Sequence, residues 1–491
     1  MLKAKYLILF LALIFGAKNA AAQSTLPTAS VGKNPVIIIP GVTGSSLVNK
    51  QTGKQVWFSV RRDKEDDLRL PITSPILANN RDNLEAKDII REIKLPSIIP
   101  DVEVYQSVID ALKGRGYTEA DWNNPTGATD VFYIFAYDWR RDNVESSKLL
   151  MQKMETVKRS LKRPDLKFDI VAHSMGGLVS RYTAMYGAAD LQPAGKLPKP
   201  NWAGARHINK ILMFGTPNEG TYGSFDAIIN GYTLISNRNL PFIDDMRPED
   251  ALTIPALFQI MPHPQTARFL DENLEPLKVD FYNPKTWETY GWGAINDPKF
   301  LGKLKDAETI KGAEVSKRRK YENADDELLS NTTHAQAKAY FAAVLSRAKR
   351  FAIALDAPTT TSPVQMYAFG GNCEPTLDAV VLLRDEKKGT WTTVTKSRDI
   401  KTALGREIPS KEVKAAMFAL GDGRVTRSSL IAENIPARAT TGTVKTVFPL
   451  ASSFFACGLH TRLFLEKPIQ DSFLSALIVE QKTASEKGNQ K

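Results

Sequence analysis

Four short stretches of the chain are mainly apolar, and each ends at a glycine, a proline or a polar residue. They lie at residues 35–40, 130–137, 168–173 and 210–217. A continuous apolar run of this length, without strict alternation of apolar and polar positions, is typical of a strand that is covered on both faces. The pattern therefore predicts neighbouring strands of a buried parallel sheet.

Apolar residues recur at helical spacing between and after these runs, over residues 145–163 and 176–191. Strands that alternate with helices favour βαβ units, in which helices cover both faces of a mostly parallel sheet. The strand pattern returns late in the chain, and a closing helix with one apolar face follows it. The late strands are expected at residues 364–371, in a hairpin-like pair at 379–396 and at 443–450, and the closing helix at 468–482.

The chain between these two parts has a different pattern. Residues 218–362 contain helical patches, many aromatic residues and prolines, and no clear strand run. We expect them to form an inserted cap, and a smaller insertion at about 48–98 to interrupt the first part. The predicted organisation is an α/β core in two parts, 23–217 and 363–482, with the cap 218–362 between them and a polar tail at 483–491.

The first residues have the pattern of a secretory signal peptide. Lys3 and Lys5 precede an apolar run from Tyr6 to Ala17, and small residues follow at 20–22. This pattern predicts a signal peptide of residues 1–22, cleaved before Gln23. The alternative is a retained anchor, but the run is shorter than the ~20 residues of a spanning helix. We therefore expect a secreted or periplasmic protein.

Composition and charge narrow the class of protein. The chain has 491 residues, 43% of them apolar, which excludes disorder as its main state. Removing the three lysines of the signal peptide lowers the formal net charge from +11 to +8. This mild basic excess favours loose association with anionic membrane surfaces. Basic segments interleaved with aromatic residues are missing from the sequence, so no nucleic-acid partner is expected.

The cysteines and histidines are few, which limits metal chemistry. Two cysteines and five histidines are too few for a clustered zinc site, and we expect no metal and no other cofactor. In an oxidising compartment Cys373 and Cys457 are expected to form one disulfide. The alternative is two buried free thiols.

Ser174 is the strongest candidate for a nucleophile. The strand 168–173 runs directly into Ser174, and a helix follows. In a nucleophile elbow this sharp strand–turn–helix projects a hydroxyl, with small residues two positions before and after it. Ala172 and Gly176 occupy those positions. The alternative is a serine that only caps a helix.

A serine nucleophile needs a histidine base that a carboxylate orients. In proteins with this elbow the chain order is Ser, then the acid, then His. His460 follows the last predicted strand and precedes the closing helix, so it is the candidate base. Asp422, between two glycines, is the candidate acid, and Asp378 is its rival. The alternatives are a surface-loop histidine beside a disulfide and an ordinary Asp–Gly turn.

The remaining histidines fit the role of the base less well. His173 adjoins the nucleophile and is expected to point away from it, and His207 precedes a strand. His263 and His334 lie in the predicted cap.

The oxyanion that forms during attack on an ester needs backbone N–H donors. The residue after the nucleophile, Met175, is one candidate donor. The loop after the first strand contains Gly41 and Gly44, which let a backbone come close, and Val42 is the second candidate. A phosphate-binding loop is excluded here, because no Gly-Lys-Ser/Thr follows the glycines.

These motifs together resemble the lecithin:cholesterol acyltransferase family, which includes lysosomal phospholipase A and phospholipid:diacylglycerol acyltransferases. The resemblance spans roughly residues 34–480. It rests on PVIIIPGVTGSSL, AYDWRRD, AHSMGGLVSRY, FGTPNEGT, FYNPKTWETYGWG and GDGRV, in the family's order and with a late histidine.

The resemblance implies an α/β-hydrolase fold with an inserted helical cap and a lid loop. It implies a triad of Ser174, Asp422 and His460, an oxyanion hole of the Val42 and Met175 amides, and no cofactor. Family members transfer an acyl chain from a glycerophospholipid or similar lipid to an alcohol or to water. The predicted function is therefore a serine-dependent lipid O-acyltransferase or phospholipase that meets its lipid substrate at a membrane or lipoprotein-like surface.

The sequence departs from the family in the lid. Soluble animal members close the lid with a disulfide, whereas this chain has no cysteine before Cys373. Trp57 and Phe58 in this insertion are candidates for lid or lipid contact, and core packing is the alternative. Asp138, Trp139 and Arg140 are interpreted as a structural ion pair and aromatic anchor.

Two other functions stay open. The same triad under a different cap fits a carboxylesterase or depolymerase of a non-lipid ester. A lipid-binding protein without turnover is the alternative from another class, and the presence of all three triad residue types weighs against it.

Overall fold

A computed structural model describes residues 33–59, 67–93, 102–232, 246–315, 328–359, 361–435, 438–440, 443–445 and 448–478. The predicted signal peptide 1–22 and polar tail 483–491 lie outside these residues. Within the described part of the chain, no helix is both long and apolar enough to cross a membrane.

The core is a seven-stranded sheet with the order β22-β13-β10-β9-β1-β8-β7, and every neighbouring pair in it is parallel. The predicted parallel sheet is confirmed. Its strands are β1 Val36–Ile39, β7 Thr118–Glu119, β8 Val131–Ile134, β9 Phe168–His173, β10 Ile208–Phe214, β13 Gln365–Gly371 and β22 Ser452–Ala456.

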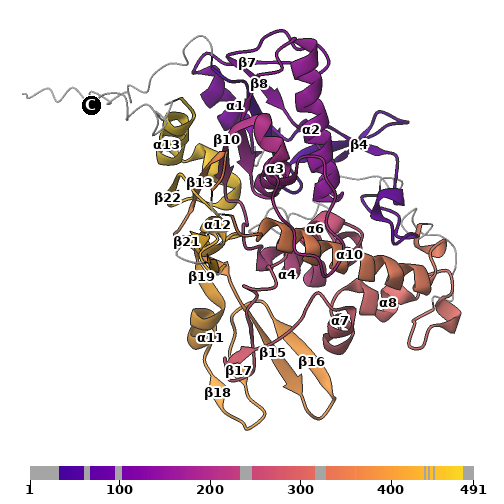
Figure 1. The fold of residues 1–491 in the computed structure, drawn as a ribbon. Coiled ribbons are helices and arrows are strands. Elements are labelled where there is room, and N and C mark those ends of the chain that lie inside the picture. The colour runs from indigo at the N-terminus through magenta and orange to yellow at the C-terminus, as the bar shows by residue number, and fades with distance from the viewer. Residues whose placement is uncertain are drawn as a thin grey trace, which may run out of the picture.

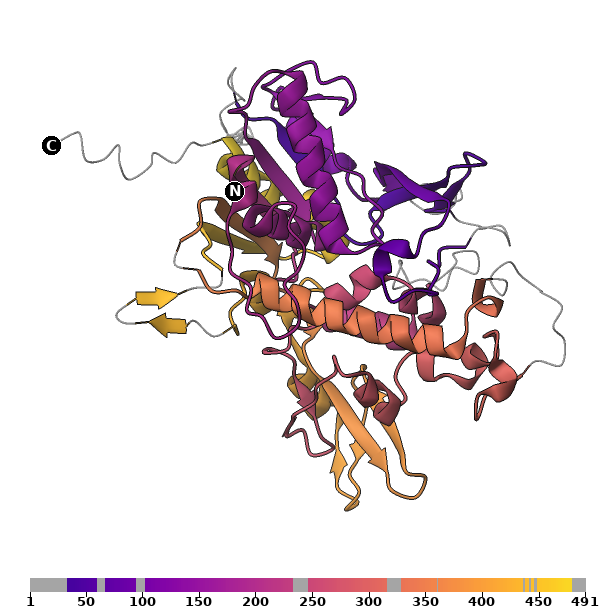
Figure 2. The same cartoon turned by 45° about the vertical axis from the view of Figure 1, so that its right-hand side comes forward.

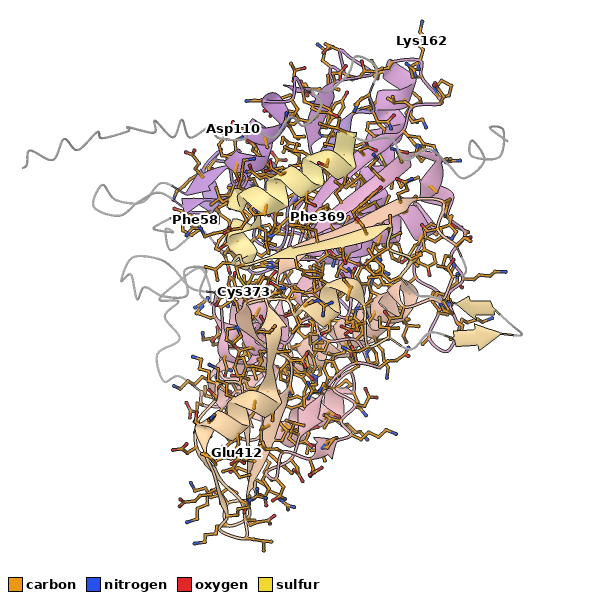
Figure 3. All side chains as sticks on the ribbon, turned by 90° about the vertical axis from the view of Figure 1, so that its left-hand side faces the viewer. Phe58, Asp110, Lys162, Phe369, Cys373 and Glu412 are labelled. Atoms are coloured by element: carbon orange, nitrogen blue, oxygen red, sulfur yellow. A yellow bond between two sulfur atoms is a disulfide. The ribbon has the colours of Figure 1, made fainter. Side chains whose placement is uncertain are left out.

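Helices cover both faces of this sheet (Figure 1). Successive side chains of a strand point to opposite faces. Ile37 and Ile39 of β1 accordingly pack in one cluster with α2 Asn143–Ser160 and α3 Met175–Tyr186. Val36 and Ile38 pack in the other cluster with α1 Gln106–Lys113 and α13 Lys467–Ile478. Figure 3 shows α13 crossing the face that carries Phe369.

Most of the cap is helical and lies below the sheet in Figure 1. Its longest helix, α10 His334–Leu355, crosses the middle of the molecule below α2 in Figure 2. The shorter helices are α4 Tyr222–Asn230, α5 Pro248–Leu252, α6 Pro255–Gln259, α7 Pro284–Tyr290 and α8 Pro298–Leu301.

The cap also contains strands, which corrects two expectations. The predicted hairpin forms as β15 Val380–Asp385 and β16 Thr390–Val394, but β15 pairs with β11 Phe269–Leu270 in a separate sheet, β12-β11-β15-β16. The second chain part therefore contributes to the cap as well as to the core. β11 and β12 Pro276–Leu277 have two residues each, too few to produce a periodic pattern.

The last core strand also differs from the prediction. Strand β22 occupies Ser452–Ala456, and the expected 443–450 run contains β21 Thr443–Lys445, which pairs with β20 Arg438–Thr440 as a separate hairpin. Because β22 is an edge strand with exposed and half-buried residues, it needs no continuous apolar run.

The remaining elements complete the core and its surroundings. The first insertion forms the sheet β3-β2-β4, made of β2 Ser45–Asn49, β3 Gln55–Trp57 and β4 Leu84–Ile89, and β5 Glu92–Ile93 pairs with β6 Val102–Glu103. The second chain part contains β14 Glu374–Leu377, β17 Ile400–Lys401, β18 Glu407–Ile408, α11 Ser410–Met417, β19 Phe418–Gly421 and α12 Arg427–Ile431. The 3₁₀ turns are η1 Leu77–Asn79, η2 Ala203–Arg206, η3 Ala294–Asn296, η4 Ala307–Thr309 and η5 His460–Leu465.

Candidate active site

Ser174 stands at the sharp turn between β9 and α3. Its backbone has φ 52° and ψ −125°, a region that residues with a Cβ rarely adopt. The Ser174 N–H donates to the Phe214 carbonyl of the neighbouring strand at 2.7 Å, which holds the turn in place. The side chain lines a cavity, and 5% of the residue is exposed.

Small residues make this turn sterically feasible. A Cβ added to Gly176 would lie 2.6 Å from the Pro40 carbonyl oxygen, and one added to Gly41 would lie 2.7 Å from the Ser174 Cβ. Both distances are shorter than non-bonded carbon contacts allow. The loop after β1 can therefore approach the serine only because both positions are glycine.

Asp422 and His460 form a close pair. The Asp422 Oδ2 and His460 Nδ1 atoms are 2.8 Å apart, and the Asp422 side chain is 1% exposed. The other carboxylate oxygen accepts hydrogen bonds from the Arg424 and Val425 amides at 2.9 and 2.7 Å. The His460 N–H donates to the Asp422 carbonyl at 2.9 Å. The carboxylate thus has a fixed orientation toward the imidazole.

Gly215 is a residue of the site that the sequence analysis did not single out. It follows β10 with φ 55°, and an added Cβ would lie 2.8 Å from both Asp422 Oδ2 and His460 Nδ1. Any side chain at this position would push the pair apart. Its sequence signal was its place near the end of the apolar run 210–217.

Ser174 and His460 line the same cavity, which has a volume of about 260 Å³. Its other walls are largely apolar and come from both core and cap. They include Val42, Ile90, Val104, Ala227, Leu257, Ile260 and Val425. The structure therefore places Ser174 and His460 at one largely apolar cavity and Asp422 against His460, although the three residues are far apart in the sequence.

The rival residues lie elsewhere. Asp378 forms an ion pair with Arg268 at the surface. His263 is buried against Asp356 at 2.7 Å, and His207 lies 3.7 Å from Glu155. Among the described histidines, His173 and His460 line the cavity.

The two candidate oxyanion donors are the residue that follows Ser174 and a residue of the cavity wall. Met175 is the first residue of α3 and fully buried, and Val42 lines the cavity. The neighbouring Gly41 N–H donates to the Tyr105 hydroxyl at 2.9 Å and so is already occupied.

Tyr105 and His173 form a connection that sequence reasoning missed. The Tyr105 hydroxyl lies 2.9 Å from His173 Nδ1, and His173 Nε2 lies 3.0 Å from the His460 carbonyl. Since Tyr105 accepts from the Gly41 N–H, its own hydrogen points to Nδ1, and the Nε2–H then donates to His460. This chain of hydrogen bonds links the loop of Val42 to the backbone of His460. Tyr105 stands in no motif, so nothing local in the sequence marked it.

The His173 ring is neutral at physiological pH. Burial, followed by the charge that His460 carries when protonated, lowers the pKa of His173 to about 3. A neutral ring is what the hydrogen-bond chain requires, because Nδ1 must accept a hydrogen bond.

The structure differs from the expected lid contact at Trp57. Trp57 is 3% exposed, donates from Nε1 to the Thr43 carbonyl at 2.8 Å and packs edge-on against Trp139. It lies in the core, and its hydrogen bond to the Thr43 carbonyl supports the loop next to Val42. Phe58 is half-buried and packs edge-on against Trp57.

The disulfide Cys373–Cys457 is formed. Cys373 lies where the core meets the cap (Figure 3), and Cys457 precedes His460 by three residues. Among the described residues, no group of three or more His, Cys, Asp or Glu side chains is arranged to hold a metal ion.

The parallel sheet, the strained serine turn and the cap define an α/β-hydrolase. A chain in the crystal structure of the Tle4–Tli4 complex has the same fold, with a TM-score of 0.52 and 14% identity over 91% of this chain and 98% of that one.

The family model of lecithin:cholesterol acyltransferase matches residues 84–430, and the chain belongs to this family. Lecithin-cholesterol acyltransferase-like 4 of Arabidopsis thaliana is 26% identical over 178 residues, which are 31% of this chain and 30% of that protein. The match thus spans less than a third of the relative's length.

Proposed function

We propose that the protein is a serine-dependent phospholipase and lipid O-acyltransferase in which Ser174, His460 and Asp422 form the catalytic triad. The observation that carries this proposal is the 2.8 Å Asp422–His460 pair beside the apolar cavity that Ser174 lines. Membership of the lecithin:cholesterol acyltransferase family supports the lipid ester as the substrate class.

The first step forms an acyl-enzyme. Ser174 Oγ attacks the ester carbonyl carbon of a glycerophospholipid while His460 Nε2 takes the hydroxyl proton. The tetrahedral intermediate collapses, the bond to the lipid oxygen breaks, and His460 returns the proton to that oxygen. A lysolipid leaves, and the acyl group remains on Ser174.

The second step transfers the acyl group to an acceptor. Water or a lipid alcohol attacks the acyl-enzyme, His460 takes its proton, and Ser174 leaves with that proton. Water yields a fatty acid, whereas an alcohol yields a new ester. The apolar walls of the cavity favour an alcohol that displaces water from the site.

Each protein group has a defined part in both steps. Asp422 stabilises the imidazolium that forms on His460, and its two backbone donors keep its second oxygen turned away from the ring. The Val42 and Met175 amides donate to the developing oxyanion.

The test is mass spectrometry of the products made from phospholipid vesicles that contain a long-chain alcohol or a sterol. The protein without residues 1–22 is compared with its Ser174→Ala variant. We expect fatty acid, lysolipid and the acyl ester of the alcohol from the unmutated protein alone, and labelling of Ser174 by a fluorophosphonate.

The other outcomes separate the alternatives. Fatty acid and lysolipid without a new ester would limit the protein to a phospholipase. Equal products from both proteins would overturn the lipid assignment. Fluorophosphonate labelling would then favour an esterase of non-lipid substrates, and no labelling would favour a lipid-binding protein.

We also propose that the protein is exported from the cytoplasm. The charge and hydropathy pattern of residues 1–22 and the disulfide both fit an oxidising compartment. N-terminal sequencing of protein from the extracellular and periplasmic fractions tests this, with Gln23 as the expected first residue. A cytoplasmic chain that still begins at Met1 would contradict export.

A further inference from the structure

A second hollow opens beside the catalytic cavity. It has a volume of about 860 Å³, and four residues line both spaces: Gly223, Ala227, Tyr232 and Arg424. It is lined by one side of α4, by residues 246–248 at the start of α5, and by β16 with the residues that follow it. We call this hollow the basic groove.

The basic groove carries a positive charge. Arg247, Lys396, Arg398 and Arg424 line it, against one carboxylate, that of Asp226. The Asp226 carboxylate accepts a hydrogen bond from Asn230 at 2.7 Å, and Arg247 pairs with Asp250 at 2.8 Å. Among the described residues, Lys396 and Arg398 form no salt bridge. The groove therefore has cationic groups left to bind an anion.

The polar wall makes the groove unsuitable for an acyl chain. Thr392, Thr393 and Thr395 of the β16 segment line it together with the cations. Burying hydroxyl and charged groups against hydrocarbon without hydrogen bonds is costly. The apolar catalytic cavity next to it has the opposite character, so the two spaces suit the two ends of one amphipathic molecule.

Arg424 connects the two spaces at a fixed place. Its amide donates to Asp422 Oδ1, so its backbone belongs to the same turn as the triad carboxylate. Its guanidinium lies over the Tyr232 ring, 4.9 Å from the ring centre. The cation at the junction is thus held in position relative to the Asp422–His460 pair.

We propose that the basic groove binds the headgroup of the phospholipid substrate and makes the enzyme prefer headgroups with a net negative charge. The inference rests on the proposed function. In a glycerophospholipid the phosphate and the reacting ester share one glycerol, so an ester at Ser174 brings the phosphate to the mouth of the cavity, where Arg424 lies. The groove beyond it attracts a phosphate with a hydroxylic headgroup and repels the ammonium group of a zwitterionic lipid.

The experiment compares dihexanoyl phosphatidylglycerol with dihexanoyl phosphatidylcholine as monomers below their critical micelle concentrations. Dispersed monomers form no anionic surface that could attract a basic protein. The ratio of the two kcat/KM values therefore measures the headgroup preference of the site alone. We expect a ratio of about five or more in favour of phosphatidylglycerol, since charge-assisted contacts at partly exposed groups are individually modest.

Substitutions in the basic groove test whether the groove causes the preference for phosphatidylglycerol. Lys396→Gln together with Arg398→Gln is expected to lower the ratio to about two or less, and Arg424→Gln to lower it similarly. Since both lipids are measured with each variant, a loss of folded protein cancels in the ratio. The matched control is Lys387→Gln together with Lys388→Gln at the exposed turn of the β15–β16 hairpin, which removes the same charge outside the groove and should keep the ratio.

Two soluble inhibitors separate a headgroup site from a general phosphate site. We expect glycerophosphoglycerol, the deacylated headgroup, to compete with the lipid at about a tenfold lower concentration than inorganic phosphate. Equal inhibition by both would overturn headgroup recognition and indicate an unselective phosphate site.

Other results also overturn the inference. Equal kcat/KM values for the two lipids would refute it and leave the phospholipase proposal intact. Hydrolysis of a neutral nitrophenyl ester, but of neither phospholipid, would refute the proposed function itself. A ratio that falls equally in the hairpin control would assign the preference to overall charge and not to the groove.

Discussion

Ser174 shows how a single residue can store backbone strain for function. A non-glycine residue at φ 52° costs on the order of 1–3 kcal/mol. The surrounding contacts have to offset this cost: the hydrogen bond to Phe214, the buried helix that follows and the close approach of the loop at Gly41. The serine is thereby held at the cavity before any substrate arrives.

Tyr105 is the residue whose removal best tests the connection between the oxyanion loop and the base. In Tyr105→Phe the buried Gly41 N–H and His173 Nδ1 both lose their partner. We expect the free energy of unfolding to fall by about 1–3 kcal/mol. We expect kcat to fall about tenfold with little change in KM, because phenylalanine keeps the ring that lines the cavity and loses only the hydroxyl that positions Gly41 and His173.

Denaturant unfolding and steady-state kinetics on a monomeric ester measure both effects. Tyr133→Phe is the matched control, since Tyr133 is also buried but its hydroxyl has no hydrogen-bond partner among the described residues. An equal kcat in Tyr105→Phe and the unmutated protein would contradict the positioning role.

His173 gives the protein a predictable response to acid. Because burial lowers its pKa to about 3, whereas an unfolded histidine has a pKa of about 6.5, the unfolded chain binds one more proton between these values. The contribution of the neutral ring to stability is complete above about pH 6.5 and is lost as the pH falls toward 3.

The difference in the free energy of unfolding between the unmutated protein and His173→Gln, measured as a function of pH, isolates this contribution. From about pH 7 to pH 4 the unmutated protein should lose on the order of 3 kcal/mol more free energy of unfolding than the variant. Burial raises the pKa of Asp169 to about 6, which produces the opposite slope, but it does so in both proteins. If the free energy of unfolding changed equally with pH in both proteins, the His173 ring would not be buried in its neutral form.

At the scale of elements, the site is assembled from the carboxyl ends of strands. Ser174 follows β9, Asp422 follows β19, and His460 follows β22. The disulfide joins the end of β13 to the end of β22, just before His460. The covalent link thus fixes the edge strand that carries the base.

Removal of the disulfide should destabilise the protein. The bond closes a loop with a sequence separation of 84, for which the chain-entropy model gives about 3–5 kcal/mol. We expect Cys373→Ala together with Cys457→Ala to lower the free energy of unfolding by this amount in denaturant titrations. Reductant should lower the stability of the unmutated protein to the same level and leave the variant unchanged; no response of the unmutated protein would contradict the prediction.

At the scale of the molecule, buried polar contacts hold the first insertion without a lid disulfide. The Arg140 guanidinium is fully buried and binds Asp138 of the core and Asp82 of the insertion, with N–O distances of 2.8 and 2.6 Å. It also donates to the Leu68 carbonyl at 3.0 Å. Trp139 donates to the Ser45 carbonyl at 3.1 Å. The ion pair and aromatic anchor predicted for this segment are structural.

Arg140→Met should therefore loosen the insertion. Removing one partner of a fully buried ion pair costs about 3–5 kcal/mol, and we expect a smaller loss here because the Asp82 and Asp138 side chains that remain are 20% and 13% exposed. We expect lower stability in denaturant and faster hydrogen exchange in β2 and β4. Arg163→Met, which breaks an exposed pair with Asp165, is the control and should change neither. Unchanged exchange in β2 and β4 would contradict the prediction.

The local pattern of apolar residues was enough to predict the strands whose residues are uniformly buried. The strands at 36–39, 131–134, 168–173 and 208–214 are covered on both faces, so their apolar runs were visible in the sequence. Edge and cap strands were misplaced or missed, because their stability comes from partners far along the chain. The hairpin of β15 and β16 was placed correctly along the chain, but its pairing with β11, more than a hundred residues earlier, was not visible in the sequence.

The sequence by itself determined the parallel core, the serine turn and a late histidine, because each depends on short-range size, hydropathy or chain order. Only the tertiary structure decided between acids: Asp422 faces His460, whereas Asp378 pairs with Arg268. It also decided that Trp57 is a core residue and that Tyr105 contacts His173. These outcomes depend on which surfaces meet after folding, and neither spacing nor composition contains that information.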